Sequence, residues 1–166
     1  DGVSDLCDEA FAYGADRVYL ADQPIFRHYR TGPYLEAVCA LVDRHKPEII
    51  LMGATGLGRD LAGAVATRVG TGLTADCTGL AIDEQGQLVQ TRPAFGGNIM
   101  ASIVTPYTRP QCATVRPNVF SAAEPDERRP VVIQNFPVTL SKAAIRTKVV
   151  EELPAAEFGE KIEEAR

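Results

Sequence analysis

The residues with the clearest chemical potential form a glycine-rich stretch, Gly53-Ala54-Thr55-Gly56-Leu57-Gly58-Arg59-Asp60. The stretch lies between an apolar run typical of a buried strand and a helical pattern. Glycines at such a junction let the backbone approach a ligand, and the first N–H groups of the helix attract an anion. In open α/β sheets, ligands bind at the carboxyl ends of the strands. The candidate cofactor-binding residues here are therefore Gly53, Thr55, Gly58, Arg59 and Asp60.

The same stretch has a purely structural interpretation. Its spacing is neither that of a phosphate-binding loop, because no Lys follows the last glycine, nor that of Gly-x-Gly-x-x-Gly. In a tight crossover, Thr55 would cap the helix and Asp60 would interact favourably with the positive end of the helix dipole. The pattern alone leaves both interpretations open.

Two arginines stand at the ends of β-like runs, Arg92 before Pro93 and Arg116 before Pro117. Either guanidinium group could reach an anionic cofactor or an acidic protein face, although arginines beside prolines are also common in hairpins without any function. Arg116 joins the candidate cofactor-binding residues.

No residue is predicted to be catalytic. Asp76 and Asp83 are separated by an apolar stretch, and neither they nor Asp60 have a nucleophile near them in the sequence. His28 lies in an aromatic and basic stretch that could meet an acidic partner or simply be an exposed loop. His45 falls near a helix C-terminus, where a cation is favoured in any case.

Metal chemistry is not predicted either. The four cysteines, Cys7, Cys39, Cys77 and Cys112, are widely separated, and only two histidines are available to complete a site. We interpret the cysteines as reduced structural thiols, which favours a reducing compartment such as the cytoplasm. Redox chemistry would then need an organic cofactor.

Composition excludes several classes of protein. Hydrophobic residues make up 45% and charged residues 23%, as in a globular domain. The net charge is -5, and the basic residues form no stripe, which disfavours nucleic acid as a partner. No apolar run approaches the roughly 20 residues of a membrane helix.

The elements that would position the candidate residues alternate in the first half of the chain. Apolar spacing predicts helices over 3–13, 33–45 and 59–69, and strands over 17–21 and 48–52. This order favours right-handed crossovers and one Rossmann-like parallel sheet.

The second half reads as mainly β. Strand-like runs cover 73–83, 88–91, 98–105 and 111–116, with turns at 84–87 and 95–98 and late strands at 131–133 and 145–153. A charged tail, 157–166, follows.

Taken together, these segments resemble the N-terminal domain of the electron transfer flavoprotein alpha subunit. The resemblance covers residues 14–120 and is carried, in this order, by Pro47-Glu48-Ile49-Ile50-Leu51-Met52-Gly53-Ala54-Thr55, Gly58-Arg59-Asp60-Leu61-Ala62, Thr71-Gly72-Leu73-Thr74-Ala75-Asp76-Cys77-Thr78, Arg92-Pro93-Ala94-Phe95-Gly96-Gly97-Asn98-Ile99-Met100-Ala101 and Ala113-Thr114-Val115-Arg116-Pro117.

The resemblance implies an α/β fold: a Rossmann-like, adenine nucleotide alpha hydrolase-like parallel sheet with helices on both faces, followed by a β-hairpin-rich segment. It also implies a non-enzymatic electron carrier that pairs with a beta subunit. Electrons from acyl-CoA or related dehydrogenases would pass through FAD to a quinone reductase or another acceptor. The family binds FAD mainly through a C-terminal domain whose flavin motifs have no counterpart in these residues.

The resemblance further suggests boundaries and a location. We expect an N-terminal α/β domain over 1–153 that lacks its front end, a linker over 154–166 towards an absent FAD-binding domain, and poor stability of the chain alone. The expected location is the cytoplasm of a bacterium or archaeon, or the mitochondrial matrix of a eukaryote.

The resemblance also gives the Gly53 to Asp60 loop a possible ligand, because the sister beta subunit holds AMP, or a second FAD, at the corresponding place. The alternative function is thus an adenine-nucleotide-binding module. A small nucleotide hydrolase is disfavoured, because the sequence offers neither a nucleophile nor a metal cluster. Arg116 and the 95–98 turn are expected to shape contacts with the flavin domain or the partner subunit.

Overall fold

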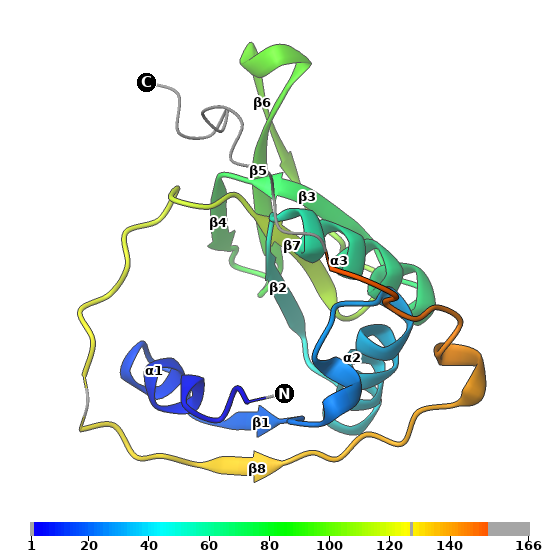
Figure 1. Cartoon of the computed structure of the whole chain (residues 1–166). Helices are drawn as coiled ribbons and strands as arrows, with labels where there is room; N and C mark the ends of the chain where they lie inside the picture. Colours follow the sequence, from blue (N-terminus) through cyan, green and yellow to red (C-terminus); the bar gives the residue numbers. More distant parts are fainter. Residues whose placement is uncertain (1, 127, 153–166) are drawn as a thin grey trace, which may run out of the picture.

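The computed structural model describes residues 2–126 and 128–152 as three small sheets with helices packed against them (Figure 1). The helices are α1 (Leu6–Ala12), α2 (Thr31–His45) and α3 (Gly56–Val69), with single 3-10 turns at Pro24–Phe26, Phe95–Gly97 and Lys142–Ala144. The strands are β1 (Val18–Leu20), β2 (Ile49–Gly53), β3 (Leu73–Cys77), β4 (Gly79–Ile82), β5 (Leu88–Ala94), β6 (Ile99–Ile103), β7 (Gln111–Val115) and β8 (Ile133–Asn135). Parallel strands with flanking helices, together with antiparallel strands, confirm the predicted fold class.

The central sheet is parallel and has the order β2-β7-β3. Its middle strand, β7, is buried from Gln111 to Thr114. Helix α3 packs against β7 through a face of small and β-branched residues, Ala62, Val65 and Ala66, all buried. Because the three strands are parallel, their carboxyl ends lie at one edge of the sheet, beside the start of α3.

The predicted strand over 73–83 is two strands in the structure. Asp76 has a left-handed backbone, φ 62°, and the pairing of β3 with β7 shifts register between Thr74 and Cys77. The chain therefore leaves the parallel sheet after Cys77 and enters the antiparallel sheet β4-β5-β6. The predicted turns of this sheet are confirmed, and the β5–β6 hairpin projects away from the parallel sheet (Figure 1).

The first half differs from the prediction of one parallel sheet. Val18 of β1 pairs with Ile133 of β8, whereas Ile49 of β2 pairs with Gln111 of β7, so α2 connects strands of two different sheets. Both partner strands lie in the second half of the chain, and spacing within the first half carries no information about them. The strand predicted at 131–133 also lies two residues later, at Ile133–Asn135.

The two long helices begin earlier than predicted. Helix α3 starts at Gly56 rather than Arg59, because Thr55 caps it, and it ends before Gly70, whose φ is 71°. Helix α2 starts at Thr31, so that Pro33 lies in its first turn, where a missing backbone N–H does no harm. No helix in the described ranges is long and apolar enough to span a membrane.

The segment after β8 crosses back over α2. Phe136 and Val138 bury their side chains against Phe26, and both side-chain amide atoms of Gln23 bond the backbone of Val138. This packing forms a core separate from the cluster of Cys77, Leu88 and Ala113, in which β5 packs against strands β3 and β7 of the parallel sheet.

The predicted strand over 145–153 is wrong for residues 145–152, which contain no strand. Their apolar alternation has no partner strand there: Val150 exposes 85% of its surface, and the backbone oxygen of Thr147 accepts a hydrogen bond from Arg30. Residue 153 and the expected linker over 154–166 lie outside the described residues, and the proposed domain boundary stays a prediction.

Candidate functional site

The predicted site residues meet at the carboxyl edge of the parallel sheet. Gly53 ends β2, and Thr55, Gly58, Arg59 and Asp60 follow in the loop and first turns of α3. Arg116 directly follows the neighbouring strand, β7, so it approaches the same edge from the sheet. The sequence therefore identified two segments that the fold brings together.

Backbone contacts make the loop between β2 and α3 tight. The Thr55 hydroxyl accepts a hydrogen bond from the N–H of Gly58 at 3.1 Å, which confirms the predicted cap. The N–H of Ala54 donates to the oxygen of Val115 at 2.7 Å. A Cβ atom added to Gly58 would lie 2.0 Å from the oxygen of Gly53, so this glycine is required by the crossover itself.

Asp60 is bound by the segment that precedes α2. Its carboxylate accepts hydrogen bonds from the Tyr29 hydroxyl at 2.5 Å and from the Thr31 hydroxyl at 2.7 Å. The bond from Tyr29 is the main cause that lowers the pKa of Asp60. Burial and then the bond to Asp60 raise the pKa of Tyr29 to about 12. Asp60 thus connects α3 to the start of α2 through two hydrogen bonds, a role that the sequence did not reveal.

The two predicted arginines share one carboxylate. Arg116 donates from Nε and Nη2 to the two oxygens of Asp76, at 3.2 and 2.7 Å, and Nη2 of Arg59 lies 3.4 Å from the same carboxylate. The hydrogen bond from Arg116 is the first cause that lowers the pKa of Asp76. The backbone N–H of Asp76 also donates to the Thr114 hydroxyl at 2.8 Å, which holds this ion-pair cluster against β7.

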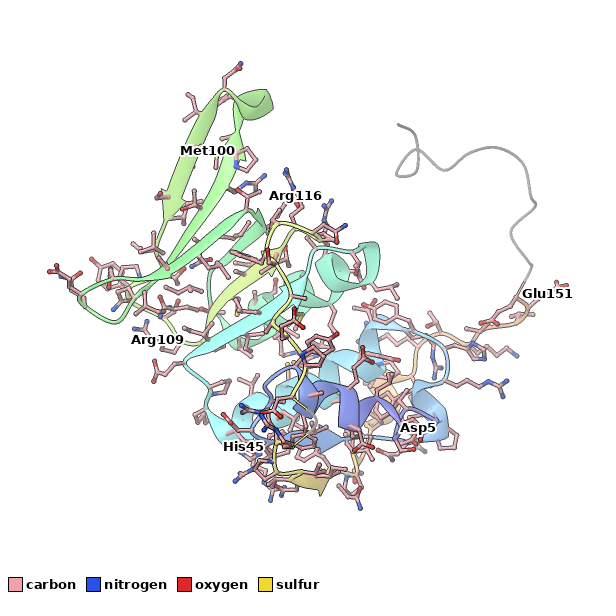
Figure 2. All side chains as sticks on the ribbon, turned by 90° about the vertical axis from the view of Figure 1, so that its left-hand side faces the viewer. Asp5, His45, Met100, Arg109, Arg116 and Glu151 are labelled. Carbon is pink, nitrogen blue, oxygen red and sulfur yellow. The ribbon has the colours of Figure 1, made fainter. Side chains whose placement is uncertain are left out.

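A third arginine, Arg92 on β5, adds to the positive charge of the cluster. Its charge also favours ionised Asp76, and it lines an open cavity of about 430 Å³ with Arg116 and the 95–97 turn. Figure 2 shows Arg116 beside the base of the β5–β6 hairpin and Met100 farther out along it. Three guanidinium groups thus lie at this edge, and two of them, those of Arg59 and Arg116, contact the carboxylate of Asp76.

Three other titratable residues that the sequence analysis considered, Asp83, His28 and His45, have contacts elsewhere in the fold. Asp83 caps the β4–β5 turn by accepting from the backbone N–H groups of Gln85 and Gln87. His28 forms an ion-pair contact with Glu152, and the ring of His45 bonds the Tyr19 hydroxyl at 3.3 Å.

The charged groups at this edge favour electrostatic contacts over proton transfer. The lowered pKa values keep Asp60 and Asp76 ionised near neutral pH, so neither is suited to donate a proton. The four cysteines are free and buried, and burial raises the pKa of Cys39, Cys77 and Cys112, which disfavours the thiolate. Across residues 2–126 and 128–152, no group of three or more His, Cys, Asp or Glu could hold a metal ion.

Comparison with known proteins gives a consistent family. The model of the family described as "Electron transfer flavoprotein domain" matches residues 1–141. The electron transfer flavoprotein subunit alpha of Thermoanaerobacterium thermosaccharolyticum is 47% identical over 163 residues, which cover 98% of this chain and 49% of the relative. The corresponding subunit of Megasphaera elsdenii is 44% identical, with 98% of this chain and 48% of the relative covered. Protein FixB of Rhizobium meliloti is 48% identical over 149 residues, which cover 90% of this chain and 42% of the relative. The chain spans about half the length of the curated relatives it matches.

Proposed function

The chain belongs to the electron transfer flavoprotein domain family, and from this membership we propose that it is the scaffolding N-terminal part of an alpha subunit that carries electrons. The observation that carries the proposal is that nearly the whole chain matches alpha subunits at 44% to 47% identity. In this role the chain positions other components and does not itself catalyse a reaction.

The chemistry of the site supports a role without catalysis. The carboxylates of Asp60 and Asp76 are engaged by hydroxyl and guanidinium groups, and the thiols are buried. In flavoproteins the cofactor supplies the redox chemistry, while the protein supplies binding, orientation and electrostatics. A domain that contributes geometry and charge needs no acid, base or nucleophile of its own.

We propose that FAD, the flavin of the assembled protein, is held mainly by polypeptide outside this chain. The Gly53–Asp60 loop is a poor fit for a second nucleotide, because the Thr55 hydroxyl caps α3 and Asp60 is bound by Tyr29 and Thr31. Asp76 also neutralises part of the charge of Arg59 and Arg116. Binding of AMP at this loop stays a prediction.

The proposed partners follow from the family. A beta subunit would pair with the chain, and acyl-CoA or related dehydrogenases would deliver the electrons. The final acceptor would be a quinone reductase or another redox protein.

Co-expression of the complete alpha subunit that carries this chain with its beta subunit tests the proposal. We expect the two polypeptides to co-purify as a yellow complex whose visible flavin band is bleached by an acyl-CoA dehydrogenase and its substrate. The beta subunit expressed alone is the control. Separate elution of the subunits, or a colourless complex after incubation with FAD, would contradict the proposal.

A further inference from the structure

The loop that precedes α2 holds a segment that returns to it after β8. Residues 138–152, orange to red in Figure 1 and here called the return strap, pack across the start of α2. Three side chains of the loop contact the strap: Gln23 at Val138, Arg30 at Thr147 and His28 at Glu152. Contacts between residues far apart in the sequence thus attach the strap at its beginning, its middle and its end.

Arg30 makes the contact in the middle of the strap. Its Nη1 donates to the backbone oxygen of Thr147 at 2.8 Å, and its Nη2 donates to that of Ile25 at 2.9 Å. Its Nε is buried without a hydrogen-bond partner among the described residues, a desolvation cost that the two bonds must offset. Because a guanidinium group presents its donors in a rigid planar fork, Arg30 holds the loop and the strap at a fixed separation.

Backbone packing fixes the position of the strap beside this bond. A Cβ atom added to Gly32, in the first turn of α2, would lie 2.2 Å from the backbone oxygen of Ala144. Ala144 is buried, and its N–H donates to the Ser141 hydroxyl at 3.2 Å. The strap therefore contacts the bare backbone of α2 at this point, and a side chain on residue 32 would displace it.

The rest of the strap is loosely packed. A cavity of about 380 Å³ lies between residues of the strap and the two long helices. Ile145 and Val149 expose 43% and 42% of their surfaces, and Val150 exposes 85%. A segment that buries so little apolar surface is stabilised mainly by its few polar and backbone contacts, so the loss of one contact can release it.

We propose that Arg30 is a positioning residue: by holding the return strap, it sets the direction in which the polypeptide continues after residue 152. While the guanidinium group joins Ile25 to Thr147, the end of the strap keeps one orientation relative to α2. Without this bond, the strap turns about its attachment at Val138. The inference rests on the proposed function, because the strap would place the flavin-binding polypeptide that lies outside residues 1–166.

A fixed direction is the property that a scaffold for a flavin requires. In cofactor proteins the polypeptide supplies binding and orientation, while the cofactor supplies the redox chemistry. The loop before α2 is suited to fix this direction, because it continues directly into α2 and its Tyr29 hydroxyl bonds Asp60 of α3. Both long helices thus support the loop from which Arg30 holds the strap.

Hydrogen exchange in the complete alpha subunit, with any subunit that co-purifies, tests whether Arg30 holds the strap. Arg30→Met should raise the exchange rate of peptides within 141–152 at least about tenfold, because two hydrogen bonds from a charged donor are lost. The matched control is Arg27→Met, which removes the same charge from an exposed side chain of the same loop and should change the rate less than about twofold. Gly32→Ala should release the strap independently, by displacing Ala144.

The distance between the flavin and this chain tests whether the strap sets the direction. The four native cysteines are buried, so a nitroxide attaches selectively to Glu84→Cys in the exposed β4–β5 turn. Pulsed electron paramagnetic resonance measures the distance from this nitroxide to the flavin after one-electron reduction. We expect the distance distribution to shift or broaden in Arg30→Met and in Gly32→Ala, and to stay unchanged in Arg27→Met.

Each negative result identifies the step that fails. Unchanged strap exchange in both Arg30→Met and Gly32→Ala would show that neither residue holds the strap. A released strap with an unchanged flavin distance would overturn its role in direction. If Arg30→Met also raises exchange throughout β7, that variant has lost its fold, and Gly32→Ala decides. A preparation that binds no flavin would contradict the proposed function and the placement of the flavin by the strap, while hydrogen exchange would still decide whether Arg30 holds it.

Discussion

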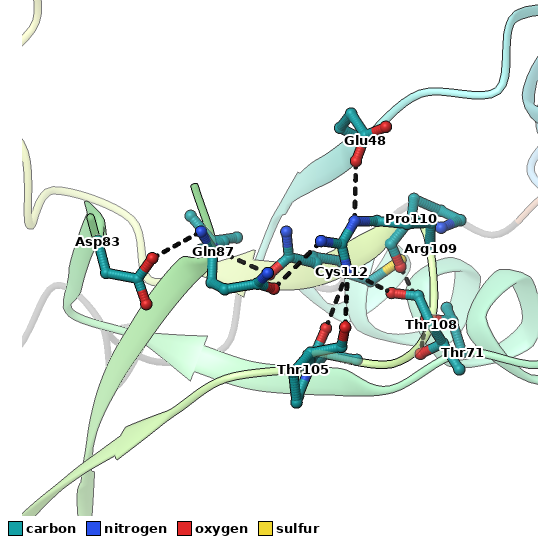
Figure 3. A network of polar contacts seen from close by, with 12 residues as sticks. Glu48, Thr71, Asp83, Gln87, Thr105, Thr108, Arg109, Pro110 and Cys112 are labelled. Carbon is teal, nitrogen blue, oxygen red and sulfur yellow. Dashed lines mark hydrogen bonds and ion pairs between the residues drawn. The ribbon is translucent and has the colours of Figure 1, made fainter. Parts of the chain in front are cut away.

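Two arginines bracket the same strand, β7, and their surroundings are opposite in kind. Arg109, just before the strand, donates from Nε to Glu48 at 2.8 Å and from Nη2 to the side-chain oxygen of Gln87 at 3.1 Å (Figure 3). Its Nη1 reaches the backbone oxygens of the preceding loop, those of Thr105, Pro106 and Thr108. Arg116, just after the strand, has its carboxylate partner in Asp76, which Arg59 shares.

The difference separates a structural arginine from one available for binding. Arg109 joins the loop before β7, the β4–β5 turn and the start of β2, and each of its three nitrogens has an acceptor in the protein. Arg116 belongs to a cluster with more donors than acceptors. Residue type and position beside a strand are the same for both, so the partners decide the role.

The largest expected effect comes from breaking the Arg109 contacts. Arg109→Ala leaves several backbone oxygens of the 105–108 loop without a donor, and we expect it to destabilise the fold by about 2–3 kcal/mol. Hydrogen exchange of the β7 and β4–β5 peptides in the complete protein measures this loss.

The matched control is Arg116→Ala at the other end of β7. Its effect on exchange should be clearly smaller, since its carboxylate partner is partly solvated and exposed ion pairs contribute little to stability. Equal destabilisation by the two variants would show that both arginines are structural, and would remove the contrast.

Gly58, at the carboxyl edge of the parallel sheet, should also be required for the stability of the fold, as Arg109 is. The Cβ of Gly58→Ala would meet the oxygen of Gly53 at 2.0 Å, so the β2–α3 loop must shift, at a cost of about 1–3 kcal/mol. Gly56→Ala, at the first position of the same helix, meets nothing within 4 Å and should be neutral or slightly stabilising. Thermal unfolding of both variants measures the difference, and a neutral Gly58→Ala would refute the tight-crossover explanation.

Sequence reasoning found the features that depend on neighbours along the chain. Apolar spacing located the three helices, and the residue type of Thr55 predicted its cap. Such reasoning could not predict the pairing of Asp76 with Arg116, because that contact joins residues 40 apart and depends on the register of β3 against β7. The left-handed backbone of Asp76 is equally invisible in an apolar run that reads as one continuous strand.

The strand predictions failed where a partner strand was decisive. Residues 145–152 have the alternation of a strand but no neighbour to pair with, whereas the short β1 is a strand because it pairs with β8, more than 100 residues later. The residue pattern within a segment predicts its tendency to form a strand but does not identify the strand that pairs with it.

A smaller effect should appear when the counter-ion of the available arginine is removed. The lowered pKa of Asp76 means that its ionised form is favoured in the folded protein. Its stabilising contribution is therefore present above the unfolded-state pKa of about 3.9 and is lost as the pH falls through the folded-state value. Asp76→Asn should lower the thermal midpoint at neutral pH and differ little from the unsubstituted protein in strong acid.

The control for this pH dependence is Asp43→Asn, which removes a carboxylate from the exposed pair with Lys46. It should change the midpoint little at either pH. A constant difference between Asp76→Asn and the unsubstituted protein across the acid range would contradict an ion pair at this position.

Tyr29 offers a still smaller and more local readout of the same edge. Because its pKa is raised to about 12, its hydroxyl stabilises the fold fully below about pH 10, the usual tyrosine value, and this contribution is lost as the pH rises through about 12. Difference absorbance between the unsubstituted protein and Tyr29→Phe should show one tyrosine that ionises near pH 12. Ionisation of that residue near pH 10 would mean that Tyr29 is neither buried nor bonded to Asp60 in solution.

The smallest expected effect is that of AMP on the unmodified protein. Isothermal titration of residues 1–166 with AMP or FAD should show no saturable heat up to about 1 mM ligand, a limit that corresponds to about 4 kcal/mol of binding free energy. The reason is that the Thr55 hydroxyl and the Asp60 carboxylate have partners inside the protein, and that Asp76 neutralises part of the charge of Arg59 and Arg116. Asp76→Asn frees those arginines and should strengthen binding of any phosphate group at this edge, so the variant is the sensitive control. Saturable heat with the unmodified protein, abolished by Asp60→Leu, would instead make the loop a nucleotide site and would assign Arg116 to it rather than to an acidic partner.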